Sequence, residues 1–258
     1  MINSIRIIGD IGSGQHGGTG SLKMFGEDRN HYLVKFKENR QGNIKVVTNE
    51  LISYLIAAKL QLPIPKSFLA IIDSNIKKLV NDQYNYSVSA GFHFASKWMD
   101  DLYPITPILF SNLQNQQSLP LIVLFDILVY NTDRNNSGNV FLHRSEDINK
   151  LIILDHGHCF NFNWDVEILN SIKDNIHQSS VSFFNDIIRG SDPFRESINT
   201  IKILDNNFLK NITDNIPAEW MISQEEKEAL SNFLIYRKEN IENILLRNKN
   251  LFPNWNEE

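Results

Sequence analysis

The pattern of apolar and polar residues divides the chain into a strand-rich first part and a mainly helical second part. Short apolar or alternating segments predict strands, namely residues 5–8, 32–37, 67–73, 86–89 and 92–98. One helix is predicted among them, with Thr48 as its N-cap and apolar residues at helical spacing up to Pro63. The boundary between the two parts is expected near residues 98–104.

From Pro120 onward the pattern is mainly helical. Residues 120–131 are apolar on almost every side, which predicts a buried helix. A short strand is expected after Asn139, and a second strand over residues 151–154. Between residues 161 and 216 the Asn- and Ser-rich sequence does not divide clearly into elements. The last helix begins at a capping box, Ser223-Gln224-Glu225-Glu226.

Composition narrows the class of protein. The 258 residues suit one two-lobed domain or two small domains, and 42% apolar residues allow a packed core. A net charge of -5 argues against a surface that coats nucleic acid, so we expect no direct nucleic-acid binding. The single cysteine, Cys159, excludes an internal disulfide. We see no signal peptide and no membrane-spanning run, and expect a cytoplasmic protein.

The strongest candidates for chemistry follow the buried helix. Asp133 comes directly after that helix, and Asp155 ends the apolar run 151–154, where a carboxylate must be paired or bound to a cation. With Asn139 between them, this order suits ATP-dependent phosphoryl transfer. One carboxylate orients the acceptor hydroxyl, while an amide and a second carboxylate hold magnesium. The structural alternatives are a local turn contact for Asp133 and a salt bridge or helix cap for Asp155.

A glycine cluster and a lysine precede these residues. Five of the 12 glycines lie within residues 11–21: Gly12, Gly14, Gly17, Gly18 and Gly20. Because glycine lacks Cβ, such a segment can lay backbone N–H groups against phosphates. The cluster matches neither the Walker nor the dinucleotide pattern, so a flexible loop is the alternative. Lys35 shares a strand face with Leu33, which indicates partial burial, and Glu50 is its expected partner. Otherwise Lys35 is a surface lysine and Glu50 interacts with the helix dipole.

A zinc site is not expected. Asp155, His156, His158 and Cys159 form a ligand-rich pentapeptide. Four ligands in so short a segment cannot easily close a tetrahedron, and no second pair with ligand spacing occurs elsewhere.

Taken in this order, the segments resemble the HipA-like protein kinases, especially the short stand-alone members. The resemblance is carried by Tyr32–Phe36, Asn49–Leu51, Leu62–Pro65, Gly91–Ser96, Phe125–Asp126, Asn131–Arg134 with Asn139, Ile153–Gly157 and Ile216–Trp220. It implies an α+β, two-lobed protein-kinase-like fold. Residues 1–98 would form the N-lobe, with the glycine-rich loop and the ATP lysine. Residues 99–258 would form the helical C-lobe, with the catalytic and metal-binding loops.

The resemblance also implies roles for single residues. Asp133 would be the catalytic base, and Asn139 and Asp155 would bind Mg²⁺. The residues expected around ATP are Gly14, Gly17, Gly18, Gly20, Lys35, Glu50, Phe94 and Ser96. Related kinases carry the metal-binding Asn five residues after the catalytic Asp, and here that position is Gly138. Either the loop has one extra residue, or Asn136 takes the role, or metal binding is weakened.

The expected activity is transfer of phosphate to a Ser or Thr hydroxyl of a protein. The resemblance implies a toxin kinase that modifies a translation factor, often an aminoacyl-tRNA synthetase, and an antitoxin as a second partner. It also implies autophosphorylation in the glycine cluster, which offers Ser13, Thr19 and Ser21. The chain is shorter than a full HipA toxin, so antitoxin contacts do not transfer directly. The alternatives are a phosphoinositide or small-molecule kinase and a pseudokinase that binds nucleotide or a partner. No basic amphipathic segment indicates a membrane role.

Overall fold

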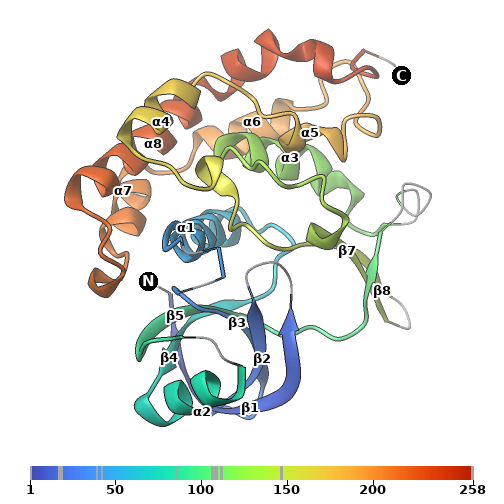
Figure 1. The fold of residues 1–258 in the computed structure, drawn as a ribbon. Coiled ribbons are helices and arrows are strands. Elements are labelled where there is room, and N and C mark those ends of the chain that lie inside the picture. The colour runs from blue at the N-terminus through green and yellow to red at the C-terminus, as the bar shows by residue number, and fades with distance from the viewer. Residues whose placement is uncertain are drawn as a thin grey trace.

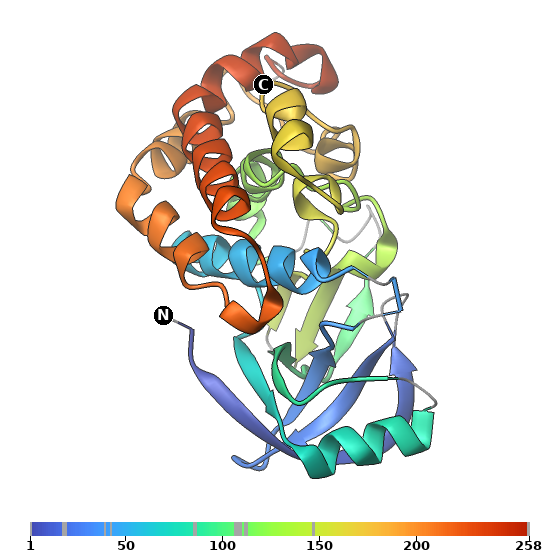
Figure 2. The same ribbon diagram turned by 60° about the vertical axis from the view of Figure 1, so that its left-hand side comes forward.

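The protein has an α+β fold with a strand-rich lobe and a helical lobe, one on each side of helix α1 (Lys45–Lys59) (Figures 1 and 2). The computed structural model describes residues 2–16, 20–38, 40–41, 43–84, 87–105, 110, 113–145 and 148–256. No helix in these segments is both long enough and apolar enough to cross a lipid bilayer.

A closed five-stranded barrel forms the first lobe. Its strands, in barrel order, are β1 (Ser4–His16), β2 (Ser21–Gly26), β3 (His31–Lys35), β5 (Gly91–Lys97) and β4 (Ser67–Ile72). Tyr32, Val34 and Phe36 belong to the apolar core of the barrel, as the alternation predicts. Leu33 and Lys35 therefore face outward, toward the second lobe. The residues described between 87 and 89 form no strand.

Two helix predictions in this lobe need correction. Helix α1 begins three residues before Thr48, which is buried and donates its hydroxyl to Ile44 O at 3.3 Å. Thr48 is therefore not the N-cap, and the Asn43 side chain accepts the Lys45 N–H instead. A second helix, α2 (Ser74–Tyr84), packs Ile76 and Val80 on the barrel. The Asp73 carboxylate caps the first turn of α2. Asp73 had been included in the predicted strand 67–73, but β4 ends at Ile72.

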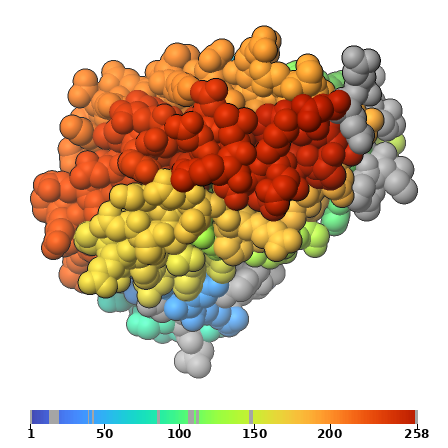
Figure 3. Space-filling view, turned by 90° about the horizontal axis from the view of Figure 1, so that it is seen from above, coloured from blue at the N-terminus to red at the C-terminus, as the bar shows by residue number. Residues whose placement is uncertain are grey.

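The second lobe surrounds a buried apolar helix. Its elements are β6 (Leu102–Pro104), α3 (Leu119–Leu128), β7 (Val140–Ser145), β8 (Ile148–Ile153), α4 (Val166–Ile172), α5 (Ser179–Ser182), α6 (Arg195–Lys202), α7 (Asn206–Asp214) and α8 (Gln224–Arg247). Helix α3 is shorter than predicted because the chain turns at Tyr130, whose φ is 49°. The predicted capping box of Ser223 and Glu226 is present at the start of α8. Figure 3 shows α8 crossing the upper face beside the α4 segment.

Helix α1 is covalently part of the first lobe but packs with the second. Leu51, Ile52 and Ile56 belong to the large apolar core that also contains α3 and α8, whereas the barrel has a separate core. Because α1 is anchored in this larger core, its opposite face is fixed relative to β3 and β8. This arrangement positions the charged residues described next.

Candidate active site

A cavity of about 510 Å³ lies where the barrel, α1 and the β6–β7–β8 sheet meet. This volume is typical of small-molecule sites. Five of the residues predicted to act in the site line it: Lys35, Glu50, Phe94, Ser96 and Asp155. The floor is built from cross-strand rows, because Leu33 pairs with Ser96 and Ser96 with Ser67, while Lys35 pairs with Phe94.

Three charged side chains from three elements meet in this cavity. Lys35, at the end of β3, pairs with Glu50 of α1 and places its Nζ 2.8 Å from Asp155 Oδ1, just beyond β8. The side chains of Lys35 and Glu50 are only 6% and 4% exposed, whereas that of Asp155 is 38% exposed. The Asp155 carboxylate is therefore the most accessible member of the cluster.

Mutual attraction decides the ionisation of this cluster. Burial raises the pKa of the Asp155 carboxyl, but the Lys35 ammonium outweighs this effect and holds it well below its usual range. Burial lowers the pKa of Lys35, and the Asp155 and Glu50 carboxylates more than reverse that. Burial raises the pKa of Glu50 to about 7 against the pull of Lys35. At neutral pH the cluster thus keeps a cationic Lys35 and an anionic Asp155.

The loop after α3 contributes Gly138 to the lining of the cavity, whereas Asp133 and Asn139 of the same loop are not among the described lining residues. Asn131 accepts the Asp133 N–H through its Oδ1 at 3.0 Å. Asn139 Nδ2 donates to Asp133 O at 2.8 Å and to Asp133 Oδ2 at 2.9 Å. Asn136 caps the turn Ser137–Asn139, because its Oδ1 accepts the Gly138 N–H at 3.0 Å, and its Nδ2 donates to Asp133 Oδ2 at 3.3 Å. Asn139 is 3% exposed and Asn136 lies on the surface, so the inward-facing amide is that of Asn139.

A fully buried arginine ties this loop to the strand that ends at Asp155. Arg134 makes a two-point contact with Asp126 of α3, at 2.8 Å from Nε to Oδ2 and 3.1 Å from Nη2 to Oδ1. Its Nη1 donates to Asn139 O and to Leu154 O, both at 2.9 Å. Neither Asp126 nor Arg134 was predicted from the sequence to have a role in the site. A lone aspartate inside an otherwise apolar helix was the available signal, since a buried carboxylate needs a partner.

The segment after Asp155 adopts an unusual backbone. Phe160, Asn161 and Phe162 have φ values of 57°, 63° and 61°. For residues with a Cβ this left-handed conformation costs about 1–2 kcal/mol each. Tertiary contacts must therefore hold the segment in place.

The glycine cluster is a hairpin rather than a free loop over its described residues. Strand β1 continues through Gly14 to His16, and its end pairs with Ser21 and Leu22 of β2. Gly20 forms part of the turn with φ 71°. Among the described residues of the cluster, Ser21 lines the cavity and Gly20 does not. Gly17, Gly18 and Thr19, and the side chain of Ser13, lie outside the described residues.

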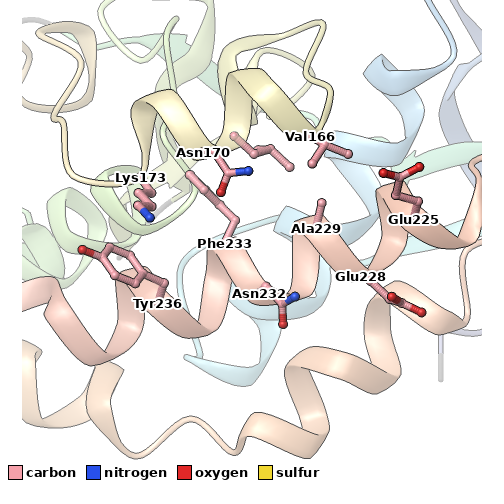
Figure 4. A pocket seen from close by; sticks show the side chains of 10 residues that line it. Val166, Asn170, Lys173, Glu225, Glu228, Ala229, Asn232, Phe233 and Tyr236 are labelled. Atoms are coloured by element: carbon pink, nitrogen blue, oxygen red, sulfur yellow. The ribbon is translucent and has the colours of Figure 1, made fainter.

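A second cavity, of about 370 Å³, lies between α4 and α8 (Figure 4). Val166 and Asn170 of α4 face Ala229 and Phe233 of α8 across it. None of the described residues predicted for the site lines this cavity. The candidate chemistry therefore belongs to the first cavity.

The architecture is that of the two-lobed kinases. The Helicobacter pylori proinflammatory kinase CtkA has a similar structure, with a TM-score of 0.62 and 16% sequence identity over 96% of this chain and 98% of its own. Two structures of the Golgi casein kinase, one with Mn and ADP bound, match less well, with TM-scores of 0.47 and 0.48. Their identities are 10% and 9%, over 94% and 95% of this chain and 73% of theirs. At such identities, the likeness to CtkA establishes the fold alone.

A sequence profile of the HipA-like kinases matches residues 7–256. The chain belongs to this family, and the predicted family and two-lobed α+β fold are confirmed. It is therefore a kinase-like phosphotransferase. Among curated proteins, none matches it by sequence.

Proposed function

We propose that this protein transfers the γ-phosphoryl group of ATP, with Mg²⁺, to a Ser or Thr hydroxyl of another protein. The observation that carries the proposal is the buried Lys35 held between Glu50 and Asp155 at the cavity. Kinase catalysis needs both a lysine paired with a helix glutamate and a metal-binding aspartate in place. Residues 1–98 would serve as the nucleotide-binding lobe and residues 99–258 as the lobe that carries the catalytic loop.

Asp155 and Asn139 are the proposed metal ligands. Mg²⁺ prefers oxygen ligands and is usually held by one or two carboxylates together with substrate phosphates. The Asn139 amide donates to Asp133 through Nδ2, which leaves its Oδ1 for a cation, whereas Asn136 Oδ1 is engaged by Gly138. When bound, the metal would neutralise phosphate charge.

Asp133 would orient the acceptor hydroxyl and accept its proton. The Asn131 and Asn139 side chains restrain its backbone and one carboxylate oxygen. The other carboxylate oxygen, Oδ1, makes no described hydrogen bond and is free to meet the hydroxyl. Since positioning dominates phosphoryl transfer, a restrained carboxylate at this place suits the role.

Lys35 would contact the nucleotide phosphates. The cross-strand rows that contain Phe94 and Ser96 would form the wall beside the adenine. Gly14, Gly17, Gly18 and Gly20 would contribute to binding of the phosphates. For the protein acceptor we propose a translation factor, such as an aminoacyl-tRNA synthetase, and for regulation an antitoxin, on the strength of family membership.

The test is transfer of label from [γ-³²P]ATP and Mg²⁺ to proteins of a bacterial lysate. We compare the wild type with Asp155→Ala and with Asp82→Ala, which changes an exposed aspartate of α2. Losing a contact to the charge-neutralising metal should lower the rate by about 10²-fold or more, whereas the control should label normally. Equal labelling by wild type and Asp155→Ala would show that Asp155 is not needed for transfer and would refute the proposed mechanism.

A further inference from the structure

The segment that links Asp155 to α4 contains no hydroxyl side chain that a Ser/Thr or Tyr kinase could phosphorylate. Its ten residues, from Asp155 to Trp164, include no Ser, Thr or Tyr. Many kinases order the corresponding segment by phosphorylating it, because the phosphate forms new pairs with arginine. This chain must order its segment by another means.

Asn49 of α1 makes the most extensive contact with the segment. Its Nδ2 lies within hydrogen-bond distance of three carbonyl oxygens, those of Gly157 (2.8 Å), Cys159 (2.9 Å) and Phe162 (3.1 Å). Its Oδ1 accepts the Trp164 indole N–H at 2.7 Å. Asn49 is completely buried. An amide suits this place because it donates and accepts at once, without a charge that burial would penalise.

The catalytic loop holds the same segment from the other side. Phe160 donates its N–H to Val129 O at 2.8 Å, and the Thr132 hydroxyl donates to His158 O at 2.9 Å. The segment is thus fixed between α1 and the residues that precede Asp133. This double attachment accounts for the three successive non-glycine residues with positive φ.

The contact with Asn49 is continuous with the charged cluster. The neighbouring residue, Glu50, accepts the His156 N–H at 3.1 Å and pairs with Lys35. A Cβ on Gly157 would lie 2.9 Å from Val46 Cγ1, so the chain can approach α1 this closely only with glycine. Two adjacent residues of α1, Asn49 and Glu50, therefore hold the two residues that directly follow Asp155, which are Gly157 and His156.

We propose that Asn49 is a positioning residue that permanently fixes the segment 155–164, and with it the Asp155 carboxylate, in the geometry that other kinases reach by phosphorylation. The proposal rests on the proposed kinase function. It assigns Asn49 no contact with substrate. Its effect passes through Asp155, so its loss should appear in the metal dependence of the reaction.

The test uses Asn49→Asp, which keeps the size of the side chain but replaces the donor by a carboxylate facing three carbonyl oxygens. We expect nearly unchanged affinity for ATP without Mg²⁺, and kcat about 10²-fold lower, as a misplacement of about 1 Å costs. The Mg²⁺ concentration for half-maximal rate should rise, and excess Mg²⁺ should recover part of the rate. Amide hydrogen exchange in residues 155–164 should accelerate. Asn211→Asp, on the exposed face of α7, is the matched control.

A purely structural role would lower the melting temperature and the active fraction but leave the Mg²⁺ dependence of the remaining activity unchanged, and that result would overturn the proposal. Wild-type kcat and exchange in Asn49→Asp would overturn it as well. If Asn49→Asp does not fold, Trp164→Phe, which removes the indole donor to Asn49 Oδ1 together with part of a buried ring, is judged by the same criteria. If the wild type transfers no phosphate, the proposed function fails. Amide hydrogen exchange in residues 155–164 then tests whether Asn49 fixes this segment. Faster exchange in Asn49→Asp than in Asn211→Asp supports that role, and equal exchange in the two variants overturns it.

Discussion

Replacing Arg134 by methionine, alone and together with Asp126→Asn, should show that Arg134 has two separate effects. One is on the free energy of unfolding, and the other is on the Mg²⁺ dependence of ATP binding. Arg134 is fully buried and makes two kinds of contact. It neutralises Asp126, and it links the carbonyl groups of Asn139 and Leu154, next to the proposed metal ligands. Arg134→Met removes both contacts. The double variant Asp126→Asn/Arg134→Met also removes the carboxylate that would otherwise remain buried alone.

The magnitudes follow from burial. Without Arg134, the unexposed Asp126 carboxylate keeps the Asn131 amide as its described side-chain donor. Breaking a buried ion pair in this way costs about 3–5 kcal/mol of the free energy of unfolding. In the double variant no carboxylate is left buried without a cationic partner. The remaining cost is that of the lost hydrogen bonds to two carbonyl groups, about 1–3 kcal/mol. The double variant should thus be more stable than Arg134→Met.

In the double variant the free energy of unfolding should partly recover, but the affinity for metal should not. The Arg134 contacts to Asn139 O and Leu154 O are absent from both variants. Loss of a group that orients metal ligands typically costs about 10–100-fold in metal affinity. We therefore expect both variants to need more Mg²⁺ for tight ATP binding. Urea unfolding measures the free energy of unfolding. Calorimetric titration of ATP at several Mg²⁺ concentrations measures the Mg²⁺ dependence of ATP binding without any acceptor protein.

The two measurements can contradict the reasoning separately. If the double variant regains wild-type Mg²⁺ dependence together with stability, Arg134 acts only by neutralising Asp126. If Arg134→Met is as stable as the double variant, the buried charge is not the dominant cost. Either result would refute the division of roles drawn from these contacts.

Three further predictions concern single residues. Asp133→Asn should bind ATP normally but lose transfer, because orienting the hydroxyl matters mainly in the transition state; unchanged kcat would exclude Asp133 as the base. Asn139→Ala should raise the Mg²⁺ requirement and Asn136→Ala should not; the reverse result in a Mg²⁺ titration would reassign the ligand. Burial lowers the pKa of His93 to about 4, so the unfolded chain takes up this proton first as pH falls. Between about pH 6.5 and 4, the wild type should lose up to about 3 kcal/mol more than His93→Gln, measured by urea unfolding; equal losses would show that His93 does not titrate in this way.

The sequence by itself determined the elements that depend on near neighbours. Alternation along residues 32–36 placed Lys35 outside the barrel core, and the Ser223–Glu226 capping box marked the start of α8. The apolar run after Pro120 marked the buried helix. These signals are local, because a cap or an alternating face is set within a few residues. Where a local signal was ambiguous, as at Thr48 and Asp73, the element boundary was wrong.

Tertiary structure alone decided which of these residues meet. The Asn49 amide finds its partners more than a hundred residues away, and Arg134 joins α3 to the end of β8. The choice between Asn139 and Asn136 as the inward-facing amide likewise depended on the turn that Asn136 caps. Local sequence preference cannot encode such pairings, because they arise only when burial of the common core brings α1, α3 and β8 to one place.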